Sequence, residues 1–310
     1  MPATFDECFQ TFPTLNPPKD FSQFWKLALE SLKRIPVEPK QKMVIKRSLV
    51  REQVTEVHFK SIGGYNLRAQ LTVPRKRGRV PGVISFHDYL ENKNMDVDRA
   101  LGDAGLAHLR LDLRGHEKVE PPPLVPPRHC IETGLDPANE SYPFYCILDA
   151  VRALDYLRLQ ESIDPGRVGL IGRGLGGMMA AFVAGLYPDK VRSVALERPG
   201  FLFLNKWNNE SLSPLAAEVR EIYAKSARMK TRSRKALEYL DCLYFVREMK
   251  QQFFVTVGLG DAKNLPAPAF ALFNHLQTEK TMDLFPDEER DPNGTEQRKK
   301  SIQFLAETLQ

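Results

Sequence analysis

Residues 168–177 read V-G-L-I-G-R-G-L-G-G, and this stretch decides the fold. The apolar run Val168 to Ile171 leads into a turn in which Gly172, Gly174 and Gly176 alternate with larger residues. The Ala-rich run M-M-A-A-F-V-A-G-L follows directly. A short apolar run, a glycine turn and an amphipathic run are typical of a strand, a tight turn and a helix. The sequence therefore predicts a strand that enters a helix through a sharp turn.

Segments on both sides of this turn alternate between strand-like and helix-like patterns. The expected strands are 54–60, 67–73, 81–86, 107–113, 191–196, 253–257 and 281–285, and the expected helices are 20–32, 145–159, 268–277 and 297–309. This alternation favours an α/β fold with a mainly parallel central sheet flanked by helices. We expect one domain over 1–310, with an N-terminal arm and helix in 1–50 and a helical insertion at 205–250.

The composition narrows the class of protein. The chain has 310 residues, 42% apolar and 27% charged, which is ordinary for a soluble globular protein. Its net charge of +5 is too small to indicate nucleic acid as a partner. The four cysteines have no metal-ligand spacing, and neither a membrane span nor a secretory signal is apparent. We therefore expect a cytoplasmic protein with reduced thiols, no metal and no cofactor.

Short motifs along the whole chain match one known family. They are D-F-S-Q-F-W at 20–25, F-H-D-Y at 86–89 (F-H-G-Y in the family), L-D-L-R-G at 111–115, G-L-D-P at 134–137, D-A-V-R-A at 149–153, L-E-Y-L-D-C-L at 237–243, V-G-L-G-D at 257–261 and F-N-H at 273–275. With these motifs the chain resembles the acetyl xylan esterase / cephalosporin C deacetylase family, carbohydrate esterase family seven. The resemblance implies an α/β-hydrolase fold, acetyl esterase activity and a homo-oligomer.

The resemblance also implies three catalytic positions, two of which have changed. The family's nucleophilic serine, in G-G-S-Q-G-G, falls on Gly174, and its triad acid falls on Asp261. The family's histidine base falls on Arg290, and the last histidine of the chain is His275. Glycine has no atom for attack, and an arginine stays protonated, so serine-based acyl transfer loses its nucleophile and its base. We therefore expect a pseudoenzyme that acts in binding or assembly.

The turn itself supplies the candidate binding groups. The backbone N–H groups of Tyr89 and Leu175 are the expected oxyanion hole, and Arg173 is a candidate binding residue beside them. Two outcomes stay open at this stage. The hole is either vacant, and able to hold a carboxylate, an acetyl carbonyl or another anion, or it is closed by larger side chains such as Leu175.

Two other functions stay open from the residues alone. One is an unconventional carbohydrate or small-ester deacetylase, in which Asp261, Glu288 or Glu289 activates water. The other is nucleotide binding, because Gly172, Gly174 and Gly177 spell G-x-G-x-x-G between a strand and a helix, and Glu197 ends the next strand.

The remaining candidates have plainer interpretations. Structural or surface roles are expected for His87, His116 and His129-Cys130. The basic stretch 220–235 is expected to be a solvated helical face, with binding of an anionic partner as the alternative. The expected partners are a second copy of the chain, a protein partner if the chain is a scaffold, or a small acetylated or anionic ligand. No membrane or nucleic acid is expected.

Overall fold

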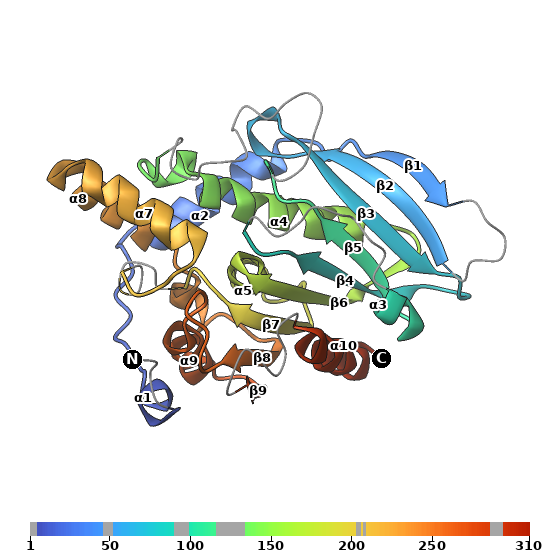
Figure 1. The fold of residues 1–310 in the computed structure, drawn as a ribbon. Helices are drawn as coiled ribbons and strands as arrows, with labels where there is room; N and C mark the ends of the chain where they lie inside the picture. Colours follow the sequence, from blue (N-terminus) through green and yellow to red (C-terminus); the bar gives the residue numbers. More distant parts are fainter. Residues whose placement is uncertain are drawn as a thin grey trace.

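The computed structural model describes residues 5–45, 52–89, 99–115, 134–202, 206, 209–285 and 294–310. Figure 1 shows a large twisted sheet with helices on both faces. The strands are β1 (Lys40–Ile45), β2 (Glu52–Lys60), β3 (Asn66–Pro74), β4 (Val80–Phe86), β5 (Ala107–Leu111), β6 (Ile163–Gly174), β7 (Ser193–Pro199), β8 (Gln252–Gly258) and β9 (Lys280–Phe285). The helices are α1 (Phe5–Phe9), α2 (Phe21–Lys33), α3 (Arg99–Asp103), α4 (Tyr142–Arg158), α5 (Leu175–Leu186), α7 (Pro214–Lys225), α8 (Ala227–Glu238), α9 (Pro266–His275) and α10 (Thr295–Leu309). Short 3₁₀ turns lie at Ile62–Gly64 (η1), Ala138–Glu140 (η2) and Cys242–Phe245 (η3).

The strands form one sheet in the order β1-β2-β3-β5-β4-β6-β7-β8-β9. The pairs from β5 through β9 are all parallel, whereas β1-β2, β2-β3 and β3-β5 are antiparallel. Strands β4 and β7 are buried along their whole length, as expected for parallel strands covered on both faces. The predicted fold class, an α/β-hydrolase architecture with a mainly parallel sheet, is confirmed.

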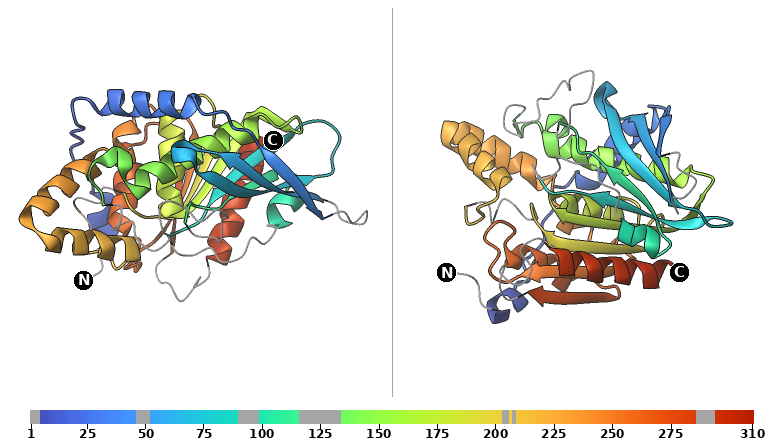
Figure 2. Two further views of the ribbon diagram at one scale, coloured as in Figure 1. Left: turned by 90° about the horizontal axis from the view of Figure 1, so that it is seen from above. Right: turned by 45° about the vertical axis from the view of Figure 1, so that its right-hand side comes forward.

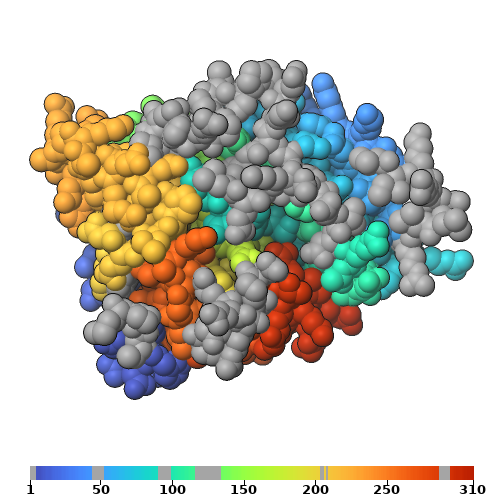
Figure 3. Space-filling model, viewed as in Figure 1, coloured from blue at the N-terminus to red at the C-terminus, as the bar shows by residue number. Residues whose placement is uncertain are grey.

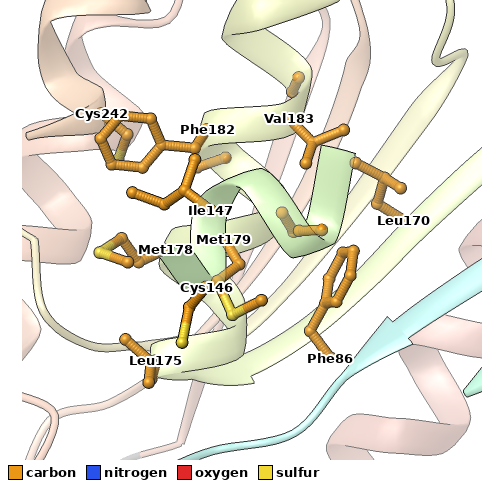
Figure 4. Close-up of a cluster of buried hydrophobic side chains, with 14 of the residues drawn as sticks. Phe86, Cys146, Ile147, Leu170, Leu175, Met178, Met179, Phe182, Val183 and Cys242 are labelled. Carbon is orange, nitrogen blue, oxygen red and sulfur yellow. The ribbon is translucent and has the colours of Figure 1, made fainter. Parts of the chain in front are cut away.

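Two apolar layers sandwich this sheet. The larger layer packs α2, α4, α5 and α9 against one face, and Figure 4 shows its centre, where Met178, Met179 and Phe182 of α5 meet Ile147 of α4. The smaller layer joins Leu101 of α3 and residues of α10 to Val83, Ile171 and Ala195 of the sheet. Helix α5, apolar on every side, is therefore held rigidly, and so is the turn at its start.

The element boundaries differ from the sequence-based expectation in several places. The region 1–50, expected to hold only an arm and a helix, also contributes β1, which pairs with β2 and widens the sheet. The insertion at 205–250 is divided at Ser226, whose extended backbone separates α7 from α8. No helix in the described part of the chain is long and apolar enough to cross a membrane.

Candidate functional site

Gly174 lies at the sharp turn between β6 and α5, where the sequence predicts the family's nucleophile. Its backbone has φ 52° and ψ −120°, a conformation that side-chain-bearing residues adopt only under strain. The turn is also tightly packed, because a Cβ on the neighbouring Gly176 would come within 2.2 Å of the Phe86 carbonyl oxygen. The backbone therefore retains a strained turn at a position that has no side chain to present.

The carboxylate of Asp88 occupies the donor groups of this turn. Asp88 follows β4, and its Oδ1 accepts hydrogen bonds from the backbone N–H groups of Tyr89 and Leu175, both at 2.7 Å. Leu175 is the first residue of α5, so the positive end of the helix dipole also faces the carboxylate. The two N–H groups expected to form the oxyanion hole thus converge on one oxygen, and that oxygen belongs to the chain itself.

Asp88 also fills the volume next to Gly174. A Cβ at residue 174 would lie 2.0 Å from both Cγ and Oδ1 of Asp88, and 2.1 Å from its Oδ2. No side chain fits at residue 174 while Asp88 keeps this position. Of the two outcomes left open by the sequence, the hole is filled, but by Asp88 rather than by Leu175, whose side chain points into the core and is 2% exposed.

His87 holds the backbone of this loop in place. The Leu113 N–H donates to His87 Nε2 at 3.1 Å, which requires that nitrogen to be unprotonated. His87 Nδ1 then carries the proton and donates to the Asp88 carbonyl oxygen at 2.7 Å. Both ring nitrogens are therefore engaged by the backbone, which is the geometry of a structural histidine and not of a general base.

Tyr89 anchors the same loop on its other side. Its hydroxyl donates to Glu218 Oε1 on α7 at 2.9 Å, and its ring packs edge-on against Tyr142 at the start of α4. The Tyr142 hydroxyl donates to the carbonyl oxygen of Arg114, whose guanidinium makes two 2.6 Å hydrogen bonds to Asp149. This chain of contacts fixes the β4 and β5 loops against α4.

Asp261, the predicted triad acid, lies in the loop after β8 and is buried, with 3% of its surface exposed. Its Oδ1 accepts hydrogen bonds from the backbone N–H groups of Lys263 at 2.9 Å and Asn264 at 2.8 Å. Its Oδ2 lies 3.8 Å from Nη1 of Arg198, a buried residue with a positive φ of 44° at the end of β7. The carboxylate therefore closes a turn and faces an arginine.

Arg198 in turn connects this carboxylate to α10. Its Nε donates to Gln297 Oε1 at 3.2 Å, and the same oxygen accepts the Thr256 hydroxyl at 2.7 Å. The Asp261 carboxylate is thus engaged by two backbone N–H groups and faces the Arg198 guanidinium. This arrangement gives no support to water activation by Asp261.

The other predicted residues are placed as follows. The Arg173 guanidinium reaches the residue before α10, since a Cβ on Gly294 would lie 2.5 Å from its Nη1. Glu197 is buried and forms an ion pair with Arg298 of α10 at 2.9 Å. Arg290, Glu288, Glu289, His116, His129 and Cys130 lie outside the described residues.

The geometry at residues 172–177 does not favour a nucleotide site. In a dinucleotide-binding turn the pyrophosphate binds at the helix N-terminus, where backbone N–H groups are available. Here the Leu175 N–H already donates to the Asp88 carboxylate, which would repel a phosphate. Glu197, which would have to bind a ribose, is 2% exposed. Among the described residues there is no cluster of three metal-ligating side chains.

Sequence reasoning missed Asp88 and Arg198. The sequence does contain a signal for Asp88, because F-H-D-Y at 86–89 carries an aspartate where the resembled family has a glycine. The sequence contains no such signal for Arg198, because its contact with Asp261 joins two strand ends that are far apart in the sequence.

Comparison with known proteins agrees with this architecture. The curated acetyl esterase Axe7A of Xylanibacter ruminicola is 22% identical over 291 residues, which cover 88% of this chain and 64% of that protein. The chain thus spans just under two thirds of the length of this relative. Acetyl xylan esterase 1 from Thermoanaerobacterium sp. JW/SL YS485 superposes with a TM-score of 0.85 at 22% identity, covering 99% of both chains. The acetyl xylan esterase from Paenibacillus sp. R4 gives 0.84 at 22% identity, covering 97% of this chain and 99% of that one.

At this identity the two solved structures establish the fold. The family assignment comes from the sequence profile of the acetyl xylan esterase (AXE1) family, which matches residues 4–308. A match over nearly the whole chain includes the turn at Gly174, the Asp88 loop and the Asp261 loop. The chain therefore belongs to the acetyl xylan esterase (AXE1) family.

Proposed function

We propose that this member of the AXE1 family has lost serine esterase activity and acts in binding or assembly. The observation that carries the proposal is the Asp88 carboxylate, which accepts both N–H donors of the expected oxyanion hole. An acyl-transfer transition state develops negative charge on oxygen, and that oxygen must be stabilised by these donors. The hole already contains an anion, so a second anion there would be repelled and left without donors.

The remaining catalytic positions support the same proposal. Gly174 supplies no hydroxyl, and Arg290 stands where the resemblance places the base. The four histidines in the described part of the chain make their hydrogen bonds elsewhere, namely His58 with Glu56, His87 with Leu113 and Asp88, His108 with Ser85, and His275 with Ala271. Nucleophile, base and oxyanion hole are therefore altered together, whereas the acid is kept in a structural role.

The expected loss of activity is large. Disabling the triad of a serine protease costs roughly 10⁶-fold in turnover, and the roughly 10³–10⁴-fold that remains over water comes from the oxyanion hole and from binding. In this chain the hole is filled as well, so even that residual contribution is reduced. The fold itself is kept, with a fully packed core around α5, and a folded domain without chemistry remains able to bind.

The test is hydrolysis of p-nitrophenyl acetate by the purified protein beside an active acetyl xylan esterase at equal concentration. Turnover equal to that of a heat-denatured sample supports the proposal. Turnover within about a hundredfold of the active enzyme contradicts it. The variants Asp88→Asn and Asp261→Asn then identify whether either carboxylate activates the attacking water.

Gly174→Ser separates the role of the base from that of the hole. It restores a hydroxyl at the elbow, and its Cβ forces the Asp88 carboxylate away from the two N–H donors. The hydroxyl still lacks a histidine base, because the described histidines make their hydrogen bonds elsewhere, so we expect no gain of turnover. A gain of turnover from this single substitution would contradict the proposal.

A further inference from the structure

Helix α8 carries most of the excess positive charge of the chain. Its twelve residues include five cationic side chains and one acidic side chain, a net charge of +4, whereas the whole chain carries +5. Figures 1 and 2 show α7 and α8 as a hairpin at one end of the molecule, and in Figure 3 this hairpin forms the end of the visible surface. The excess charge is therefore concentrated on the element that extends farthest toward that end.

The cations of α8 are exposed, and most of them have no partner within the described structure. Arg232 pairs with Asp136, but Arg228, Lys230 and Lys235 form no ion pair with any described residue. The inward face of the helix holds Ser233, Ala236 and Leu237, so the charged side chains occupy the outward face. Three cations of this face, Arg228, Lys230 and Lys235, are therefore not engaged by the described part of the chain.

The charge pattern opposes the stability of the helix itself. Cations lie four residues apart at Arg228 and Arg232, and again at Lys230 and Arg234, and like charges at this spacing destabilise a helix. The first turn contains no acidic residue and places Arg228 beside the positive end of the helix dipole. A helical face selected only for solubility would alternate its charges.

Helix α10 shows the usual arrangement in the same molecule. Its first turn contains Glu296, and Lys300 pairs with both Glu296 and Asp283. Lys300 thus pairs within its own helix, whereas Arg228, Lys230 and Lys235 of α8 form no such pair. The charge of α8 therefore requires an explanation outside the helix.

We propose that the outward face of α8 binds an acidic segment of a protein partner. Arg228, Arg232 and Lys235 form a row with spacings of four and three residues, or roughly 6 and 4.5 Å of rise, which matches carboxylates at the same spacing on a partner helix. Arginine also binds carboxylates through two parallel hydrogen bonds. The surface is separate from Gly174 and Asp88, and the proposal holds whether or not ester hydrolysis is lost.

The composition of α8 disfavours the two other anionic partners. A helix that lies in a membrane interface buries large apolar side chains, and the only large apolar residue exposed on α8 is Met229, at 37%. Single-stranded nucleic acid is bound through aromatic stacking, and residues 227–238 contain no aromatic side chain.

The test is the fluorescence anisotropy of a labelled oligo-glutamate peptide titrated with the full chain at physiological salt. The informative variant is Arg228→Glu/Lys230→Glu, which places acidic residues in the first turn and creates Glu–Arg pairs with Arg232 and Arg234. We expect binding at least about tenfold weaker, together with an unfolding midpoint equal to or above that of the wild type. A substitution that damaged the fold would instead lower both the affinity for the peptide and the unfolding midpoint.

The matched control is Arg75→Glu/Arg77→Glu, which makes the same change in net charge in the exposed turn after β3. We expect this control to bind the peptide as the wild type does. Three results would overturn the proposal: no binding of the peptide, equal losses in both variants, or tighter α8-dependent binding of single-stranded DNA or phosphatidylserine vesicles than of the peptide.

Discussion

Gly174 and Asp88 are expected to behave as one energetic unit, and a double-mutant cycle measures their coupling. In Gly174→Ser the new Cβ would lie 2.0 Å from the Asp88 carboxylate, so the carboxylate must shift away from the two N–H donors. Hydrogen bonds to a charged group contribute about 1.5–3 kcal/mol each. The strained backbone at φ 52° adds about 1–3 kcal/mol for any residue with a side chain.

These magnitudes give an expected pattern of unfolding free energies. Gly174→Ser alone costs about 4–6 kcal/mol, and Asp88→Gly alone costs about 2–3 kcal/mol, because water can satisfy the exposed N–H groups in part. In the double variant the hydrogen bonds are lost only once and the clash is absent. We therefore expect a coupling of about 2–3 kcal/mol, so that Asp88→Gly is nearly neutral in the Gly174→Ser background.

Urea denaturation of the four proteins measures this cycle, and Gly63→Ala is its control. Gly63 also has a positive φ, at 69°, but a Cβ there meets nothing within 4 Å. Gly63→Ala should therefore cost strain alone and combine additively with Asp88→Gly. Additivity within about 0.5 kcal/mol in the Gly174→Ser cycle would refute the reasoning, because it would mean that the two side chains do not compete for one site.

Three further predictions concern the frame around the site. Burial, together with the nearby Arg298 and Arg110, lowers the pKa of His108 from 6.5 to about 3, so between these pH values the unfolded chain binds a proton that the folded chain does not. The free energy of unfolding should therefore fall by up to about 1.4 kcal/mol per pH unit as the pH drops from 6.5 towards 3. Denaturation curves of His108→Asn, measured over the same pH range, should lack this part of the slope. Asp149→Asn leaves the buried Arg114 guanidinium without its charged partner and should cost about 3–5 kcal/mol by urea denaturation, with part of the loss recovered in Asp149→Leu/Arg114→Leu. Burial raises the pKa of the Cys146 thiol to about 12, so this thiol should resist Ellman's reagent at pH 8 until the protein unfolds, and fast reaction of native protein at this residue would contradict its placement.

Most of the architecture follows from local sequence patterns. The V-G-L-I-G-R-G run predicts β6, the turn and α5, and the predicted 145–159 and 297–309 helices correspond to α4 and α10 within a few residues. Strand β1 was missed because K-Q-K-M-V-I begins with three polar residues and has no apolar alternation, and it becomes a strand by pairing with the edge of β2. The register at that edge depends on the partner strand, which no local pattern contains.

The site was predictable only in part, for a similar reason. The sequence places the family's serine position at Gly174, because a turn motif has a fixed frame in which one missing side chain stands out. The position of the Asp88 carboxylate could not be predicted from the sequence. It depends on the contact between the loop after β4 and the start of α5, which are 87 residues apart. The partner of Asp261 depends in the same way on the meeting of β7 and β8.

The most direct test of the account is whether the Tyr89 and Leu175 amide protons are bonded to the Asp88 carboxylate. Amide proton chemical shifts, measured by NMR on the wild type and on Asp88→Asn at the same pH, report these two bonds. We expect both amide protons to lie downfield in the wild type, and to move upfield together in Asp88→Asn, while the Lys263 and Asn264 amides at Asp261 stay unchanged. Unchanged Tyr89 and Leu175 shifts would mean that the hole is not filled by Asp88, and the account of lost esterase chemistry would then lack its main support.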